Sequence, residues 1–439
     1  MATPVLVLFT QDLRLHDHPA LTTALRSAGP VVPLFVLDPV LLRRAARNRL
    51  AYLAEALADL RAGLRDLGGD LVLRRGDTVT ETLGLAQEIG ARTVHLGAGV
   101  SRFAERRLAG LRAAGPAVHV HPGVTVVPAG GITPAGGDHY KVFTPYWRAW
   151  EKARWREVLP VPERMELPDG IAPGDLPTSD DLVRGGVGSL APERRVGGWT
   201  RARERLRNWI DQGLADYGDR HDDLSGAATS HLSADLRFGC LSALEVARAT
   251  RDLPGGDEYV RQLAWRDFHY QVTAAFPDIN VRDYRPRDRP WRRDPDALAA
   301  WKEGRTGVPI VDAGMRQLLR EGFMHNRTRM ITASFLTRTL MVHWREGGAH
   351  FDAHLVDGDV ANDFGNWQWV AGTGNDTRPG RGFNPTRQAR RFDPEGTYVR
   401  RYVAELAGLP GARVHTPWLE EDGEGAEGYP PPIADPGRG

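Results

Sequence analysis

DGDVANDFGNWQWVAGTGNDTRPGRGFNP, residues 357–385, combines features that one segment seldom combines. Carboxylates at Asp357, Asp359 and Asp363 precede a Trp-Gln-Trp and a turn region rich in Gly, Asn and Pro, and we expect no simple periodic element here. An unpaired charge buried beside indoles is very costly, so these acids require partners such as a polar ring system or a buried arginine. Long ordered loops are often functional, which favours a ligand site over a surface loop with two core tryptophans.

Composition describes a globular protein large enough for two domains. The chain has 439 residues, of which 41% are apolar and 26% charged, and each of two domains could bury its own core. The formal net charge is only +1, so a partner carrying phosphates has to meet a local basic patch. Because Cys240 is the one cysteine, the sequence excludes an internal disulfide and an all-cysteine metal or iron–sulfur cluster. We expect Cys240 to be a small core residue.

The N-terminus MATPVLVLFTQDLRLHDHP has a short apolar run followed by charges. It lacks the basic start and small-residue cleavage site of a signal peptide, so it predicts a strand. No stretch approaches the roughly 20 apolar residues that a bilayer crossing needs. We therefore expect a soluble, cytoplasmic protein that does not associate with membranes.

Residues 1–125 alternate short apolar runs with amphipathic stretches. Strands are predicted at 4–9, 31–37, 70–76, 93–97 and 117–122, and a helix at 47–68. Strands separated by helices indicate a doubly wound, Rossmann-like parallel sheet, hence an α/β domain. No G-x-G-x-x-G follows the first strand, so a dinucleotide clamp there is not supported.

Three further regions follow the α/β domain. Residues 126–200 are rich in Gly and Pro and read as an interdomain linker, interrupted by a helix around 146–158. Residues 201–416 show almost entirely helical patterns, which predicts an all-α domain. Residues 417–439 are acidic and rich in Pro and Gly, and we expect them to form a flexible tail.

The first candidate binding motif is TSHLS, residues 229–233. Hydroxyls and backbone N–H groups near a helix start can hold phosphate oxygens. An ordinary helix N-cap explains the same residues, and on this motif alone it is the more common explanation. Tyr217 lies 12 residues before Thr229.

The second motif is YVRQLAWRDFHYQ, residues 259–271. Gln262, Trp265, Arg266 and His269 are spaced by three and four, so they share one face of a helix. A core face seldom carries an amide, a guanidinium and an imidazole. A wall facing a ligand does, because an indole stacks on a base while an amide bonds its edge.

The third motif is GFMHNRTRMITASFL, residues 322–336, in which Asn326, Met330 and Ser334 fall on one helical face. A surface helix with scattered arginines does not explain a shared stripe of Asn and Met. The chain also contains 12 tryptophans. Most are expected to be packing residues, but closely spaced indoles can also carry an electron stepwise, since indole is easily oxidised.

In this order, and together with LFTQDLRLHDHPAL (8–21), YKVFTPYWRAW (140–150) and RRFDPEGTYVRRY (390–402), the motifs resemble the cryptochrome/photolyase family. Within it the chain is most similar to bacterial class I cyclobutane pyrimidine dimer DNA photolyases. The resemblance implies an α/β domain linked to a helical domain that holds FAD. It also implies light-driven electron transfer from reduced flavin to a pyrimidine dimer, a carbon–carbon lyase reaction on a lesion flipped out of DNA.

The resemblance carries specific residues with it. It implies FAD contacts from Tyr217, Thr229, Ser230, Leu232, Ser233, Tyr259, Arg266, Arg329, Asp357, Asp359 and Asp363. It implies lesion or DNA contacts from Gln262, Trp265, Asn326, Arg327, Met330, Trp369 and Gln388, and phosphate contacts from Arg327, Arg378, Arg381 and Arg387. It implies an electron relay of Trp291, Trp344 and Trp367. Arg329 is expected to pair with Asp357, and Trp265 to stack on the damaged bases.

Two positions depart from the pattern of dimer photolyases. Gln262 stands where they usually have Glu and resembles the (6-4) photolyases, although those carry histidines at the positions of Asn326 and Met330. Asp363 stands where they have Asn beside flavin N5, and plant cryptochromes have Asp. Burial raises the pKa of a carboxyl, so Asp363 could be a neutral acid. As a carboxylate it would repel the anionic flavin, which leaves a blue-light photoreceptor of the cryptochrome type as the alternative function.

The second chromophore of the family is less clearly indicated. VSRFAERR (100–107) lacks the Asn-Glu pair of folate-binding members, so a deazaflavin antenna, a folate antenna or none are equally compatible with the sequence. No metal site is predicted. The expected partner is damaged DNA, bound by a monomer.

Overall fold

The computed structural model describes residues 3–27, 29–226, 228–375, 382–420 and 426–436. The chain divides into two compact units. Unit 1 comprises Met1–Val187, Arg195–Ala215 and Ser230–Asp278, and unit 2 comprises Gly188–Arg194, Asp216–Thr229 and Ile279–Gly439. Among the helices of the described ranges, none combines the length and the apolarity that a membrane crossing requires.

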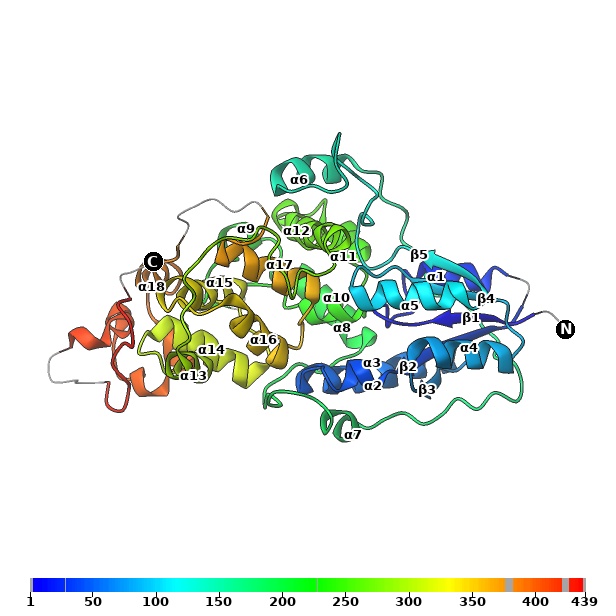
Figure 1. The fold of residues 1–439 in the computed structure, drawn as a ribbon, viewed down its shortest axis with the longest axis horizontal. Coiled ribbons are helices and arrows are strands. Elements are labelled where there is room, and N and C mark those ends of the chain that lie inside the picture. The colour runs from blue at the N-terminus through cyan, green and yellow to red at the C-terminus, as the bar shows by residue number, and fades with distance from the viewer. Residues whose placement is uncertain (1–2, 28, 227, 376–381, 421–425, 437–439) are drawn as a thin grey trace. The chain divides into compact units, whose positions relative to one another are not determined.

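The α/β part of unit 1 is built on a parallel sheet (Figure 1). Its strands are β1 Val5–Leu8, β2 Val31–Leu37, β3 Val72–Arg75, β4 Thr93–Gly97 and β5 Ala117–His121. All neighbours pair in parallel, in the order β3-β2-β1-β4-β5. The order reverses at β1, and right-handed crossovers on the two sides of a reversal place helices on opposite faces. The predicted doubly wound parallel sheet is confirmed.

The sheet forms because β1, β2 and β4 are short apolar runs that bury one continuous core, while β5 at the edge is largely exposed. Leu6, Leu34 and Val94 are fully buried and pack with side chains from the two helices that follow β3 and β4. Polar N-caps start those helices: Asp77 accepts a hydrogen bond from the Thr80 N–H, and Ser101 accepts one from the Ala104 N–H.

Unit 1 also holds most of the helices before residue 279. They are α1 Pro19–Leu25, α2 Pro39–Leu42, α3 Arg47–Asp66, α4 Thr78–Glu88, α5 Arg102–Ala113, α6 Phe143–Lys152, α7 Ser179–Val183, α8 Trp199–Gln212, α10 Ser233–Phe238, α11 Ala243–Thr250 and α12 Gly256–Ala275. Cys240, between α10 and α11, is buried as expected.

Unit 2 is helical throughout its described part. Its helices are α9 Tyr217–Arg220, α13 Pro295–Glu303, α14 Pro309–Glu321, α15 Asn326–Ser334, α16 Trp344–His354, α17 Val360–Ala371, α18 Pro385–Phe392 and α19 Thr397–Tyr402. A π-helical turn at Phe335–Thr339 continues α15, and short 3-10 turns follow at Ala404–Leu406, Gly411–His415 and Pro417–Leu419. Part of the acidic tail makes specific contacts: the Tyr429 hydroxyl donates to Asp312 at 2.5 Å, and the Ile433 N–H donates to the Thr306 carbonyl at 2.9 Å.

One predicted helix differs in its bounds. The helix expected around 146–158 begins at Phe143 and ends at Lys152, where Ala153 turns extended. Beyond it the chain is drawn away from helical geometry because the Arg156 guanidinium binds Asp17 and the Leu159 N–H donates to the same carboxylate at 3.1 Å.

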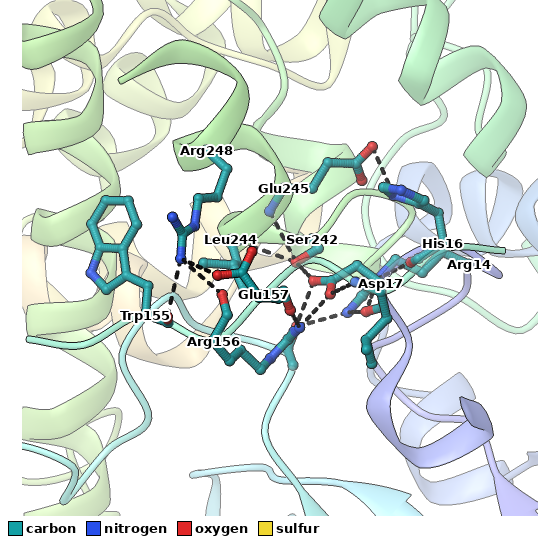
Figure 2. Close-up of polar contacts among 12 residues, drawn as sticks. Arg14, His16, Asp17, Trp155, Arg156, Glu157, Ser242, Leu244, Glu245 and Arg248 are labelled. Atoms are coloured by element: carbon teal, nitrogen blue, oxygen red, sulfur yellow. Dashed lines mark hydrogen bonds and ion pairs between the residues drawn. The ribbon is translucent and has the colours of Figure 1, made fainter. Parts of the chain in front are cut away.

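Asp17 is the centre of a buried polar network in unit 1, drawn in Figure 2. Its side chain is fully buried, and its backbone lies in the left-handed region at φ 51°. The carboxylate accepts hydrogen bonds from Arg156, at 2.8 Å for Nη2, and from the Ser242 hydroxyl. Buried Arg14 donates to the Asp17 carbonyl at 2.8 Å. The network therefore joins the loop after β1, the segment after α6 and the start of α11.

Burial by itself would raise the pKa of Asp17, but the hydrogen bonds from Arg156 and Ser242 outweigh it and hold the pKa below the ordinary value. Asp17→Ala is therefore expected to lower the free energy of unfolding by about 3–5 kcal/mol at neutral pH, since it leaves the half-buried Arg156 guanidinium and the buried Ser242 hydroxyl without their acceptor, and buried Arg14 without a neighbouring negative charge. Urea denaturation measures the loss. A carboxyl whose pKa is lowered by folding contributes its full stabilisation only at pH values above its pKa in the unfolded chain. The difference in free energy of unfolding between the wild type and Asp17→Ala should therefore become smaller as the pH falls below about 4.

The matched control is Asp252→Ala, which removes an exposed carboxylate and should change stability by no more than about 0.5 kcal/mol. Equal losses for the two variants would contradict the role assigned to the Asp17 network.

Candidate functional site

A partly buried arginine paired with two buried carboxyl groups organises the middle of unit 2. Arg329 extends from α15, and its Nη2 lies 2.7 Å from Asp357 Oδ2, so the expected pairing is confirmed. Its Nη1 lies 3.8 Å from Asp363 Oδ1 on α17. Asp357 and Asp363 are only 7% and 8% exposed, so water screens these charges poorly.

One cation does not compensate two buried anions, and Asp363 responds by retaining its proton. Burial raises the pKa of Asp363 to about 8; the positive charge of Arg329 only partly offsets this increase, and the negative charge of Asp357 adds to it. At neutral pH the Asp363 carboxyl is therefore mostly neutral. Its Oδ2 accepts a hydrogen bond from the Asp359 N–H at 2.8 Å, which holds the group in place.

The structure corrects the expectation that residues 357–385 contain no periodic element. Residues Val360–Ala371 form α17. Asp359 caps its start by accepting a hydrogen bond from the Asn362 N–H at 2.9 Å, and Gly372, at φ 82°, ends it. An acidic N-cap and a C-terminal glycine are the signal that could have located this helix. Arg378 and Arg381 lie outside the described residues.

Unit 2 also presents buried acceptors that fit a polar ligand. Within the described ranges, neither Asp357 Oδ1 nor Gln388 Oε1 has a hydrogen-bond partner, although both atoms are buried. Leaving a buried acceptor unsatisfied is costly. A ligand with N–H or hydroxyl donors would relieve that cost, and the ring N–H and ribityl hydroxyls of FAD are donors of this kind. The residues present therefore fit the cofactor.

The TSHLS motif leads into α10; its residues from Ser230 on belong to unit 1, and Thr229 is the last residue of its segment of unit 2. The Ser230 hydroxyl accepts hydrogen bonds from the Tyr259 hydroxyl at 2.8 Å and from the Leu232 N–H at 3.3 Å. Leu232 is buried and Ser233 exposed at the helix start. This fixes Ser230 and Tyr259 as one polar pair, contributed by α12 and the segment before α10.

Three further predicted residues of α12 differ in their surroundings. Gln262 is exposed, and Trp265 and Arg266 are partly exposed. The Arg266 guanidinium donates to the Val124 carbonyl at 2.6 Å, so this cation binds the chain's own backbone. Trp265 stacks on Phe143 of α6, a contact that sequence reasoning missed.

The predicted substrate residues of unit 2 have mixed surroundings. At the start of α15, Asn326 is exposed and Met330, one turn on, is partly exposed, as are Trp369 and Gln388. Arg327 is already engaged, since its Nη2 lies 2.6 Å from Asp222. Tyr217 is buried at the start of α9, and Thr229 is partly exposed.

The three tryptophans of the expected relay lie on or near neighbouring helices of unit 2. Trp367 and Trp344 are buried and Trp291 is partly exposed. The Trp344 indole N–H donates to Asp283 at 3.0 Å. The centroid of the His343 ring lies 4.9 Å from that of Trp291 and 5.7 Å from that of Trp344. Trp301, one of the tryptophans outside the expected relay, is fully buried and meets Trp367 edge to face, with ring centroids 6.1 Å apart.

A glycine allows α16 and α17 to approach closely. A Cβ placed on Gly347 would lie 2.2 Å from Trp367 Cη2 and 2.5 Å from Leu336 Cδ2. The Trp367 ring therefore rests directly on the backbone of α16, and a larger residue at position 347 would displace it.

Comparison with known proteins agrees with this geometry. A family model described as "DNA photolyase" matches residues 5–166, and one described as "FAD binding domain of DNA photolyase" matches residues 259–438. A deoxyribodipyrimidine photo-lyase of Streptomyces griseus is 51% identical, with 98% of this chain and 96% of that protein covered.

Solved structures extend the similarity. A bacterial class III photolyase from Agrobacterium tumefaciens matches with a TM-score of 0.87 at 34% identity, covering 99% of this chain and 95% of that one. A Synechocystis cryptochrome matches with a TM-score of 0.91 at 29% identity, covering 99% and 97%. The chain belongs to the cryptochrome/photolyase family. Family membership, the combined α/β and helical fold and FAD as the cofactor are thereby confirmed.

Asp363→Asn is expected to remove a pH-dependent penalty. Between about pH 4 and pH 8 the folded protein keeps a proton on Asp363 that the unfolded chain releases, so the free energy of unfolding falls as the pH rises. The variant should therefore gain stability relative to the wild type over that range, by up to ~1.4 kcal/mol per pH unit. Urea denaturation at several pH values measures the gap. With Asp252→Asn as the control, a gap that stays constant from pH 5 to pH 8 would contradict the neutral carboxyl.

Gly347→Ala is expected to lower the free energy of unfolding by about 1–3 kcal/mol, because the added methyl overlaps the Trp367 ring. Gly84→Ala in α4 is the matched control: no heavy atom lies within 4 Å of its added Cβ, and it should gain about 0.5–1 kcal/mol. Thermal or urea unfolding compares them. Two variants of equal stability would mean that α16 and α17 do not need the glycine.

Proposed function

We propose that this protein is a deoxyribodipyrimidine photolyase that splits cyclobutane pyrimidine dimers in DNA with the energy of blue light. The observation that carries the proposal is the Arg329–Asp357 pair with the unsatisfied buried acceptor of Asp357, in a chain that matches photolyases over almost its whole length. FAD in its reduced form, once excited by light, would supply the electron that splits the dimer and would take it back afterwards.

The residues proposed to hold FAD are those that the family resemblance implies. In unit 2, Arg329, Asp357 and Asp359 would bind and orient its polar groups, with Asp357 Oδ1 as an available acceptor. Tyr217, Thr229, Leu232, Ser233 and Arg266 complete the proposed set together with the Ser230–Tyr259 pair, whose hydroxyls are suited to phosphate oxygens.

Asp363 would hold a proton at the cofactor site. As a carboxylate it would oppose an anionic ring, and this conflict is why the sequence left repair in question. With its pKa raised to about 8, the group adds no negative charge at neutral pH. It can then donate a hydrogen bond, so Asp363 is compatible with repair.

Trp367, Trp344 and Trp291 would pass an electron inward when the enzyme has to be reduced. Two features of the chain suit them to this role. The Asp283 carboxylate accepts the Trp344 N–H, and a nearby negative charge stabilises an oxidised indole. Trp291 is partly exposed, so a positive charge that reaches it is stabilised by water.

The lesion would be held by exposed or partly exposed side chains. The proposed set is Gln262, Trp265, Asn326, Met330, Trp369 and Gln388. Arg387 is exposed on α18 and available to a phosphate. Arg327 would have to exchange its ion pair with Asp222 for a phosphate, so we expect it to contribute less. Because Gln262 cannot carry a negative charge, we expect altered efficiency with the same substrate.

A blue-light photoreceptor of the cryptochrome type is the second candidate, favoured by Asp363 alone. A neutral acid at this site can give up a proton as well as donate a hydrogen bond, which suits a signalling cycle. The proposal also includes a cytoplasmic monomer as the acting form, which gel filtration with light scattering can test.

The test is repair of dimer-containing oligonucleotides by the reduced protein under blue light, followed as restored thymine absorbance with a dark sample alongside. The wild type should repair in light only. Illuminated, reduced protein that restores no thymines would leave the photoreceptor as the better proposal.

Trp367→Phe separates the two electron routes. It should slow light-driven reduction of oxidised FAD by at least about tenfold, since the relay loses its innermost indole, while chemically reduced enzyme still repairs. Trp155→Phe, a buried indole of unit 1, is the matched control and should retain both activities. Undiminished photoreduction in Trp367→Phe would exclude the proposed relay.

A further inference from the structure

α6 is fixed to α12 by hydrogen bonds that leave it little freedom. The Gln271 side chain binds the Tyr140 backbone twice, accepting from its N–H and donating to its carbonyl, both at 2.8 Å. Fully buried Asp267 accepts the Trp150 indole N–H at 2.9 Å, and the N–H groups of Val126 and Val127 at the same distance. Several buried hydrogen bonds therefore hold α6 and the segment before it against α12.

This attachment presses one ring onto Trp265. Phe143, the first residue of α6, is buried, and its ring lies 3.6 Å from that of Trp265 with an interplanar angle of only 7°. Phe268 meets both rings edge to face, at 5.8 Å and 5.7 Å. Two aromatic rings left to themselves prefer an offset or edge-to-face arrangement to a parallel overlay. The parallel stack is therefore imposed by the attachment of α6.

The stack determines how Trp265 can be used. Phe143 covers one face of the indole, while Trp265 as a whole stays partly exposed. An indole clamped on one side has its plane fixed before any ligand arrives. Ordering such a side chain only on binding would cost conformational entropy, so an indole fixed in advance binds a stacked base more tightly.

We propose that Phe143 is a positioning residue for the lesion: it backs Trp265 and fixes the plane on which the flipped pyrimidine stacks. The proposal rests on the proposed function, since it takes Trp265 to be the stacking platform. According to this proposal, α6 contributes to the recognition of damage, although it belongs to the segment that was expected to be a linker.

The test compares Phe143→Leu with Phe143→Tyr in the complete, FAD-containing protein. Binding of a dimer-containing oligonucleotide and of the same undamaged sequence is measured in the dark by fluorescence anisotropy. Phe143→Leu should weaken binding of the damaged strand by roughly three- to tenfold and leave the undamaged one unchanged, because base stacking is the interaction affected. Phe143→Tyr keeps the ring and should retain wild-type selectivity.

A second readout reports on Trp265 without DNA. The change in the near-ultraviolet circular dichroism spectrum from wild type to Phe143→Leu should have the same shape as the change from wild type to Trp265→Phe, since both variants remove the same stack. Phe35→Leu, the same change at a buried position in β2, is the control for general destabilisation and should keep full selectivity.

The outcomes separate this proposal from the proposed function. A wild type that binds dimer DNA no better than undamaged DNA contradicts both. A selective wild type whose Phe143→Leu variant is equally selective overturns the role of Phe143 alone. So does a variant that loses affinity for both strands to the same degree, or one matched by Phe35→Leu.

Discussion

The charge balance around Arg329 is the constraint on which unit 2 depends. One guanidinium lies among two nearly buried carboxyl groups, Asp357 at 2.7 Å and Asp363 at 3.8 Å. Coulomb energies grow several-fold where water is excluded, so the site tolerates one anion beside the cation and keeps the second acid protonated. Since the three residues come from α15, the segment before α17 and α17 itself, the same balance that sets the protonation state also fixes these elements in register.

Close packing complements this electrostatic constraint. Gly347 lets α16 touch the Trp367 ring, and the π-helical turn after α15 supplies Leu336 to the same contact. π-Helical turns are uncommon and often mark functional sites, because they re-aim side chains that a regular helix would bury elsewhere. Trp367 is therefore packed on several sides against elements that cannot shift independently, as the proposed relay requires if the separation between its indoles is to stay fixed.

Features that depend on local sequence patterns could largely be predicted, whereas features that depend on contacts between distant residues could not. The strands could be located because each is a short apolar run, and the Arg329–Asp357 pair because the family resemblance carried it. α17 was not predicted, although its caps at Asp359 and Gly372 are local, because the Asn, Asp and Gly residues within it are typical of turns. The Phe143–Trp265 stack lies beyond any local pattern: it depends on how α6 is attached to α12, which residue spacing does not reveal. The engagement of Arg327 by Asp222, far away in sequence, escaped for the same reason.

Asp267 and Asp363 show how the chain assigns different tasks to two buried carboxyl groups that each neighbour an arginine. Burial raises the pKa of both. The pKa reaches only about 6 for Asp267, where Arg266, two backbone N–H groups and the Trp150 indole stabilise the anion. It reaches about 8 for Asp363, where Arg329 and the Asp359 N–H oppose the increase less effectively and the negative charge of Asp357 adds to it. At neutral pH the first is mostly ionised and the second mostly neutral. The hydrogen bonds that Asp267 accepts stabilise its carboxylate and attach α6 to α12. Asp363 accepts fewer hydrogen bonds and keeps a proton, which a bound cofactor could use.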